Sequence, residues 1–188
     1  MELRYLNLKY EEVIDFDNML SHILYLSPLK KKYNDIIKEN TNGQKALWKF
    51  GISGDIPIVL VTIDKIEDID IVKTMLKAHE YWRNKGLKLD LVILNQDESS
   101  YLQPLRDLIQ DTVMRSVTRD LLNRSGGIYV LNANEIEMKD VTLLFTVAKL
   151  IIHAQKGSIS KQIKLLPTSL ESQKLEIEIL TEMKCPVK

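Results

Sequence analysis

The stretch Ile58-Val59-Leu60-Val61-Thr62-Ile63 decides the fold class of this chain. It is short, almost wholly apolar and rich in β-branched residues, which is typical of a strand buried on both faces. Two runs of the same kind follow at residues 89–94 and 127–131. The segments between them are long enough for crossover helices. The order β-α-β-α-β-α predicts an α/β fold with a small three-layer parallel sheet.

Each predicted strand is followed by a stretch with helical periodicity. Asp64 and Gly86 mark the two ends of the first helix, as a cap and a stop. The second helix is expected to begin near Ser99, and the third to run from Asn134 to Gly157. Right-handed crossovers would place these helices on the faces of the sheet.

The chain divides by character into three parts. Residues 1–45 are predicted to be linker helices, with apolar residues at helical spacing and a stop at Pro28. We expect this N-terminal helical pair to pack on one edge of the sheet. Residues 46–165 form the predicted α/β domain. Residues 166–188 are a linker or tail leading to an absent following domain, and residues 175–179 alternate in it like a half-buried strand.

Composition excludes several classes of function. Lys plus Arg and Asp plus Glu both number 26, so the balanced charge argues against a nucleic-acid binder and against direct membrane contact. No apolar run approaches the roughly 20 residues of a membrane span. The lone Cys185 excludes an internal disulfide and a multi-cysteine zinc site. A reducing, cytoplasmic compartment is the natural expectation.

Signatures of nucleotide and zinc chemistry are incomplete. The first strand is followed by Asp64 and Lys65, without the glycine-rich turn that lets backbone approach a pyrophosphate. His79-Glu80 begins like the helix of a zinc protease, but Arg83 stands where the second histidine belongs. We therefore expect His79 to be a packed helix residue, and the chain to hold no cofactor.

Other candidate groups also have a structural explanation. Asp68 and Asp70 match the pattern with which many nucleotide-sugar glycosyltransferases hold a divalent ion, but carboxylates in a first helical turn also favour the helix dipole. His22, His79 and His153 fall on three separate predicted helices. No nucleophile and base are thus paired by the sequence, and we expect no catalytic residue and no metal site.

Two surfaces remain as candidate ligand sites. Asp64, Asn95 and Asn132 come directly after the three predicted strands, where open parallel sheets bind ligands, although they could equally cap a helix or form turns. The alternative is a docking loop formed by Trp48, Ser53 and Asp55, which could equally be a lid over the core. The apolar neighbours of Trp48 predict a largely buried ring, so we favour the crevice at the strand ends.

Several blocks of sequence resemble one family. Residues 47–60, LWKFGISGDIPIVL, are similar to a segment of the cyclic β-1,2-glucan synthases, which belong to the cellobiose phosphorylase-related glycosyltransferases. Residues 78–83 with 91–95, and residues 126–130, look like the next two blocks in order. Residues 2–6 and the helix after them resemble the linker helices that follow the family's β-sandwich.

The resemblance implies a role without catalysis. Family members are very large and carry their catalytic acid and phosphate-binding residues on an (α/α)₆ barrel, whose motif has no counterpart here. The resemblance implies an excised accessory module that packs against a β-sandwich and an α/α barrel, or contacts β-glucan. It also allows for anchoring of the parent protein in the inner membrane. The alternative is a self-sufficient small α/β enzyme or nucleotide-binding module.

Overall fold

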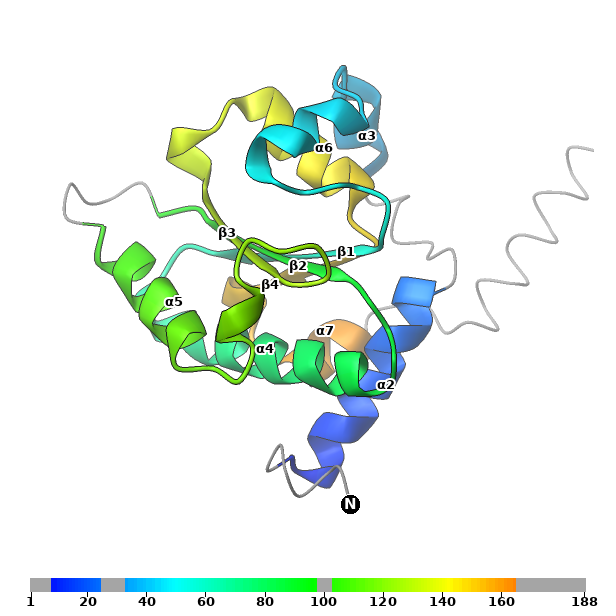
Figure 1. Ribbon diagram of the computed structural model, residues 1–188, viewed down its shortest axis with the longest axis vertical. Helices are drawn as coiled ribbons and strands as arrows, with labels where there is room; N and C mark the ends of the chain where they lie inside the picture. Colours follow the sequence, from blue (N-terminus) through cyan, green and yellow to red (C-terminus); the bar gives the residue numbers. More distant parts are fainter. Residues whose placement is uncertain (1–7, 25–32, 98–102, 165–188) are drawn as a thin grey trace, which may run out of the picture.

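The structure is a computed structural model that describes residues 8–24, 33–97 and 103–164 (Figure 1). Its centre is a sheet of four parallel strands in the order β3-β2-β1-β4. The strands are β1 (Ile58–Ile63), β2 (Asp90–Asn95), β3 (Ile128–Asn132) and β4 (Leu150–His153). β1 and β2 are buried at every position. The predicted α/β fold with a parallel, three-layer sheet is confirmed.

Two layers of helices flank the sheet (Figure 1). One layer contains α2 (Tyr10–Leu24), α4 (Ile69–Asn84), α5 (Pro104–Met114) and α7 (Ile159–Lys164). The other contains α3 (Asn34–Glu39), α6 (Met138–Val147) and the 3-10 helix η2 (Gln44–Phe50). Shorter 3-10 turns are η3 (Ile66–Asp68), η4 (Arg119–Leu121), η5 (Ala133–Glu135) and η6 (Ala154–Lys156).

The strand order explains why α6 lies apart from α4 and α5. The chain steps from β1 to β2 to β3 in one direction, and then returns to place β4 on the other side of β1. Because parallel crossovers are right-handed, this reversal carries α6 over the opposite face. The carboxyl ends of β1 and β4 therefore meet at a topological switch point, the place where open α/β sheets bind ligands.

Alternation along the strands divides the apolar side chains between two cores. One face of the sheet packs on α2, α4, α5 and α7, and the other packs on η2 and α6. The first core includes the strand residues Val59, Val61, Ile63, Leu91 and Ile93, and the second includes Ile58, Leu60, Val92 and Leu94. This two-sided burial is why both strands consist of continuous apolar runs.

The prediction of one long third helix is wrong. α6 ends at Val147, and Ala148 has φ −58° and ψ 133°, which leaves the helical region. Two residues after Ala148 the chain enters a strand, β4, because its apolar run pairs with the free edge of β1. The backbone N–H of Lys149 donates to the carbonyl of Ile58 at 2.8 Å, at the start of this pairing.

The two N-terminal helices do not pack together on one edge. α2 contacts α4 and α7 on one face, whereas α3 packs against α6 on the other. Phe16 and Met19 of α2 are fully buried in the first core, so hydrophobic burial draws this helix onto the face of the sheet. The domain boundary at residue 45 stays a prediction. The expected strand at 175–179, the stop at Pro28 and the start near Ser99 lie outside the described residues.

Within the described ranges, no helix has both the length and the apolar character needed to cross a membrane.

Candidate functional site

The carboxyl ends of β2 and β3 carry two asparagines in direct register. Asn95 donates from Nδ2 to Oδ1 of Asn132 at 3.2 Å, and its own Oδ1 accepts the backbone N–H of Asp97 at 3.0 Å. Asn132 donates to Glu135 at 2.9 Å, and Glu135 accepts from Arg106 of α5 at 2.7 Å. The structure thus brings Asn95 and Asn132 together as predicted, but within a chain of hydrogen bonds that binds neighbouring loops to each other.

Glu135 and Arg106 of this chain of hydrogen bonds were not anticipated. The available signal was the three-residue spacing from Asn132 to Glu135, which η5 brings within hydrogen-bond reach. Arg106 comes from a different crossover unit, 29 positions away from Glu135, and local spacing gives no indication of such a contact. Both asparagine side chains are buried, because β2 and β3 end beneath these loops.

Asp64 is not part of the hydrogen-bonded chain that contains Asn95 and Asn132. It follows β1 at the switch point, and its Oδ1 is buried without a hydrogen-bond partner among the described residues. No hydrogen bond in the described ranges joins it to Asn95 or Asn132. Its predicted role as the cap of the first crossover helix is wrong, because η3 intervenes and α4 begins only at Ile69.

A histidine lies between two hydroxyl groups at the other side of the switch point. His153 ends β4, and its Nδ1 is 2.8 Å from Oγ1 of Thr62 on β1. Its Nε2 is 2.9 Å from the hydroxyl of Tyr33, and its ring stacks on Phe145 with centroids 6.3 Å apart. Because a neutral imidazole can donate from one nitrogen and accept at the other, both hydroxyls can be satisfied. This cluster was missed because residue 153 was expected in a helix.

Two buried ionisable residues, His79 and Asp90, lie at the amino end of the sheet. His79 is 2% exposed, and its Nε2 is 3.2 Å from the carbonyl of Leu89, so its predicted place in the packed stripe of α4 is confirmed. Asp90 opens β2, is fully buried, and accepts the backbone N–H of Gly126 at 2.7 Å. Burial lowers the pKa of His79 and raises the pKa of Asp90. Both shifts favour the neutral forms.

The docking loop of Trp48, Ser53 and Asp55 also lies at this amino end, with Trp48 in η2 and the other two residues between η2 and β1. The expectation that Trp48 is largely buried is wrong, since its side chain is 58% exposed. Leu47 and Ile52 fill the core beneath the loop in its place, at 1% and 0% exposure. In a 3-10 helix the successive side chains point about 120° apart, so Leu47 facing the sheet turns its neighbour outward.

Polar contacts hold the loop in one conformation. The indole Nε1 of Trp48 donates to the carbonyl of Ser53 at 3.3 Å. Gln44 donates to the same carbonyl at 2.9 Å and to Oδ1 of Asp55 at 2.8 Å. The backbone N–H of Asp55 also donates to Oγ of Ser53 at 3.3 Å, so Ser53 links Trp48 to Asp55 through hydrogen bonds. Trp48 and Asp55 are both exposed.

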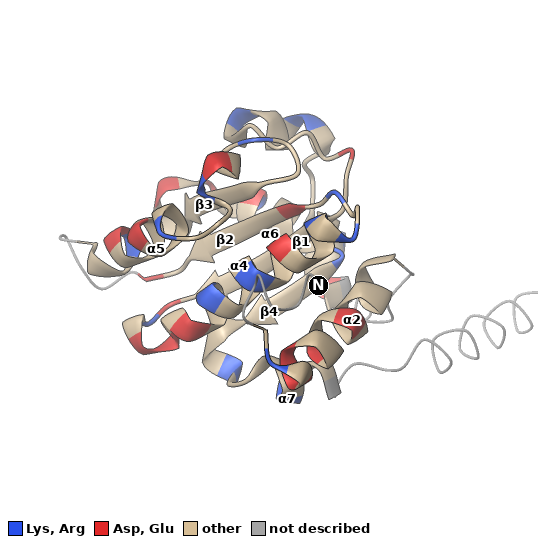
Figure 2. Cartoon of the chain, turned by 60° about the horizontal axis from the view of Figure 1, so that its bottom comes forward, with Lys and Arg blue, Asp and Glu red and all other residues tan. Residues whose placement is uncertain are grey.

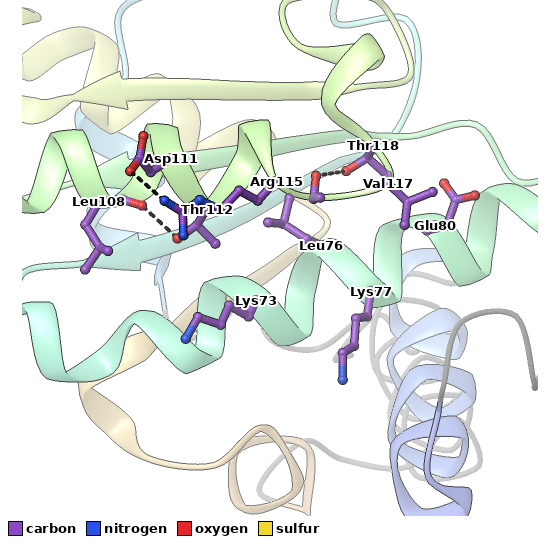
Figure 3. Close-up of a pocket in the computed structure, with 11 residues that line it drawn as sticks. Lys73, Leu76, Lys77, Glu80, Leu108, Asp111, Thr112, Arg115, Val117 and Thr118 are labelled. Carbon is purple, nitrogen blue, oxygen red and sulfur yellow. Dashed lines mark hydrogen bonds and ion pairs between the residues drawn. The ribbon is translucent and has the colours of Figure 1, made fainter.

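The described surface also has a groove between α4 and α5, with a volume of about 550 Å³ (Figure 3). Leu76 and Leu108 contribute to its mainly apolar lining, and Val117 at its end is 58% exposed. Charged residues of the lining have ion-pair partners, such as Arg115 with Asp111 at 3.5 Å. The groove was not foreseen, because it forms only where two crossover helices meet.

The charge pattern differs between helices: α2 carries four acidic residues and no Lys or Arg, whereas α4 and α5 carry both signs. On the side of the molecule shown in Figure 2, acidic and basic positions are interspersed over α4 and α5. Within residues 8–24, 33–97 and 103–164, no three His, Cys, Asp or Glu side chains are grouped so that they could hold a metal ion.

Comparison with known proteins gives one informative match. No protein-family model matches the chain. The chain is 29% identical over 177 residues to the cyclic beta-(1,2)-glucan synthase NdvB of Rhizobium meliloti (strain 1021). The match covers 94% of this chain but only 6% of NdvB, so the chain spans a small part of the protein that it resembles. This chain is related in sequence to that glucan synthase.

Proposed function

We propose that this chain is a non-catalytic accessory module of a large glucan-synthesising or phosphorolysing glycosyltransferase. The observation that carries the proposal is the match itself, which includes nearly the whole chain and only 6% of a glucan synthase. A segment of that size fits one α/β unit among several in the larger protein. The partners would be neighbouring domains of the same polypeptide, together with the β-glucan chain.

The hydrogen bonds at the strand ends support a structural role. Asn95, Asn132 and Glu135 occupy the edge where open sheets usually present groups to a ligand. Here these side chains bond to one another and to Arg106, which connects the loops after β2 and β3 to α5. The apolar groove between α4 and α5 would suit packing against a neighbouring domain.

The finer parts of the proposal come from the resemblance. The proposed module belongs among the cellobiose phosphorylase-related glycosyltransferases and lies between a β-sandwich and an α/α barrel. The proposed cytoplasmic location comes instead from the chain's single cysteine. The reading frame that surrounds the coding sequence tests this arrangement: a sandwich should precede the module and a barrel should follow it.

A small-molecule site at the switch point is the second candidate. The observation in its favour is Asp64, whose Oδ1 is buried without a described partner at the place where open sheets bind ligands. In this case the chain would be a self-sufficient small α/β enzyme or a nucleotide-binding module. Asp64, Asn95 and Asn132 would then be the residues that touch the ligand.

An activity assay separates the two candidates. The full chain would be incubated with α-glucosyl phosphate, with phosphate plus β-glucan, and with UDP-glucose. We expect no turnover above background. Turnover that disappears in Asp64→Asn, but persists in the surface variant Lys65→Gln, would contradict the non-catalytic role and favour the switch-point site.

A further inference from the structure

We propose that Trp48 and its loop form a binding platform for one glucose unit of a β-glucan. This inference rests on the proposed function and gives it a location at the amino end of the sheet. The starting observation is the position of the side chain. Trp48 is 58% exposed, whereas the chain's other tryptophan, Trp82, is fully buried and donates from Nε1 to the carbonyl of Phe16 at 2.9 Å.

A hydrogen bond restrains the exposed ring. Its Nε1 donates to the carbonyl of Ser53, which fixes the indole against the loop that follows η2. The loop is itself anchored, because the hydroxyl of Tyr129 on β3 donates to the carbonyl of Gly51 at 3.0 Å. A ring fixed before binding loses little conformational entropy when a ligand stacks on it.

Two glycines give the loop its tight shape. Gly51 and Gly54 both have φ of 75°, in the left-handed region that other residues rarely adopt. A Cβ at Gly54 would lie 2.8 Å from Cγ of Gln44 and 3.0 Å from Cδ1 of Leu47. The turn at Gly54 therefore needs glycine. This turn packs the loop against η2, the helix that carries Trp48.

The groups around the ring suit a sugar. The C–H face of a pyranose ring is apolar and stacks on an aromatic face, while its edge carries hydroxyl groups that need hydrogen-bond partners. Asp55 is exposed in the same loop and offers a carboxylate, which accepts from Gln44. Ser53, whose carbonyl accepts the indole N–H, adds a hydroxyl. An uncharged, hydroxyl-rich ligand matches this combination of one aromatic face and a polar rim.

The two tryptophans make the test direct. In a ¹⁵N–¹H spectrum of the full chain, each indole N–H gives its own signal, and Trp48→Phe identifies the one from Trp48. On titration with linear β-1,2-gluco-oligosaccharide, we expect the Trp48 signal and the amides of Ser53 and Asp55 to shift. The Trp82 signal should stay in place, which also reports that the core is intact.

Variants measure the contribution of the ring. We expect Trp48→Ala to weaken binding at least about tenfold, while the Trp82 signal is unchanged. Tyr10 is the matched control, because it is an aromatic with 79% exposure on α2, and Tyr10→Ala should bind as the original chain does.

Two results would overturn the platform. One is a Trp48 signal that does not move at millimolar sugar. The other is a set of shifts confined to Asn95 and Asn132, which would move glucan contact to the opposite edge of the sheet and leave the accessory role standing. Turnover in the activity assay would instead contradict the non-catalytic accessory role. Failure of the Trp48 platform can therefore be distinguished from failure of the proposed function.

Discussion

At the scale of single residues, burial determines which polar groups are structural. Asp90 is fully enclosed at the start of β2, with one described backbone donor on its Oδ1 and with its Oδ2 unpartnered among the described residues. Burial raises the pKa of Asp90 above its ordinary value of 3.8, and the nearby backbone N–H groups of Gly126 and Gly127 act against that rise. The ionised carboxylate is thus held at a net free-energy cost near neutral pH.

This cost predicts a contrast between two variants. Asp90→Asn keeps an oxygen for Gly126 and removes the charge, so at pH 7 it should be at least as stable as the original chain. Asp90→Ala leaves that buried N–H without its acceptor and should lose about 1–3 kcal/mol of unfolding free energy. Urea unfolding measures both changes.

The contribution of Asp90 to the free energy of unfolding depends on pH in a defined direction. A raised pKa means that the folded state binds the Asp90 proton more tightly than the unfolded state, so this residue favours folding at low pH and the effect is lost as pH rises through the folded pKa. Any advantage of Asp90→Asn should therefore shrink as the pH falls toward 3.8. An advantage that grows with acidification would contradict the assigned burial effect.

Single residues also show what the sequence could and could not predict. Asn95 and Asn132 were placed correctly because each directly follows a buried run, and parallel strands end at one edge. Trp48 was misplaced because apolar neighbours indicate burial only on average. Its actual exposure depends on the 3-10 geometry of η2, in which Leu47 takes the inward position.

At the scale of elements, β4 is the strand that local sequence did not predict. Four residues are too few to establish a strand period within a stretch that also has helical spacing. Its position is determined by pairing with β1, a contact made between residues about 90 positions apart. β1 and β2, with six residues each, could be recognised from their apolar runs alone.

One side chain covers the carboxyl end of β4. Gln162 of α7 accepts the backbone N–H of His153 at 3.0 Å and donates to its carbonyl at 2.8 Å, so it takes the place of a further strand. It also donates to the carbonyl of Gly157 at 3.0 Å. Covering an edge strand in this way prevents pairing with another chain.

A substitution series tests this role of Gln162. Gln162→Ala should lower the unfolding free energy by about 1–3 kcal/mol, because it leaves backbone groups of β4 unpaired. Gln162→Glu should recover little, since a carboxylate cannot donate to the carbonyl of His153. Lys161→Ala, at the exposed neighbouring position, is the control and should stay within about 0.5 kcal/mol. Equal stability of all three variants would show that the edge needs no such cover.

At the scale of the whole molecule, strand order and sequence similarity give different kinds of information. The order β3-β2-β1-β4 locates a switch point, but many unrelated functions share this architecture. The sequence similarity is to a cyclic beta-(1,2)-glucan synthase, of which this chain matches 6%, and the proposed accessory role starts from that similarity. The proposed role follows from the sequence similarity, and the position of the Trp48 loop follows from how η2 packs on the sheet.

The most direct test of the accessory role is cyclic glucan formation by NdvB in which the matched segment is either deleted or replaced by this chain. The account predicts that deletion abolishes or strongly reduces glucan formation, because neighbouring domains lose their packing partner, and that replacement restores a measurable part of it. Full synthesis after deletion, or replacement that performs no better than deletion, would contradict the account.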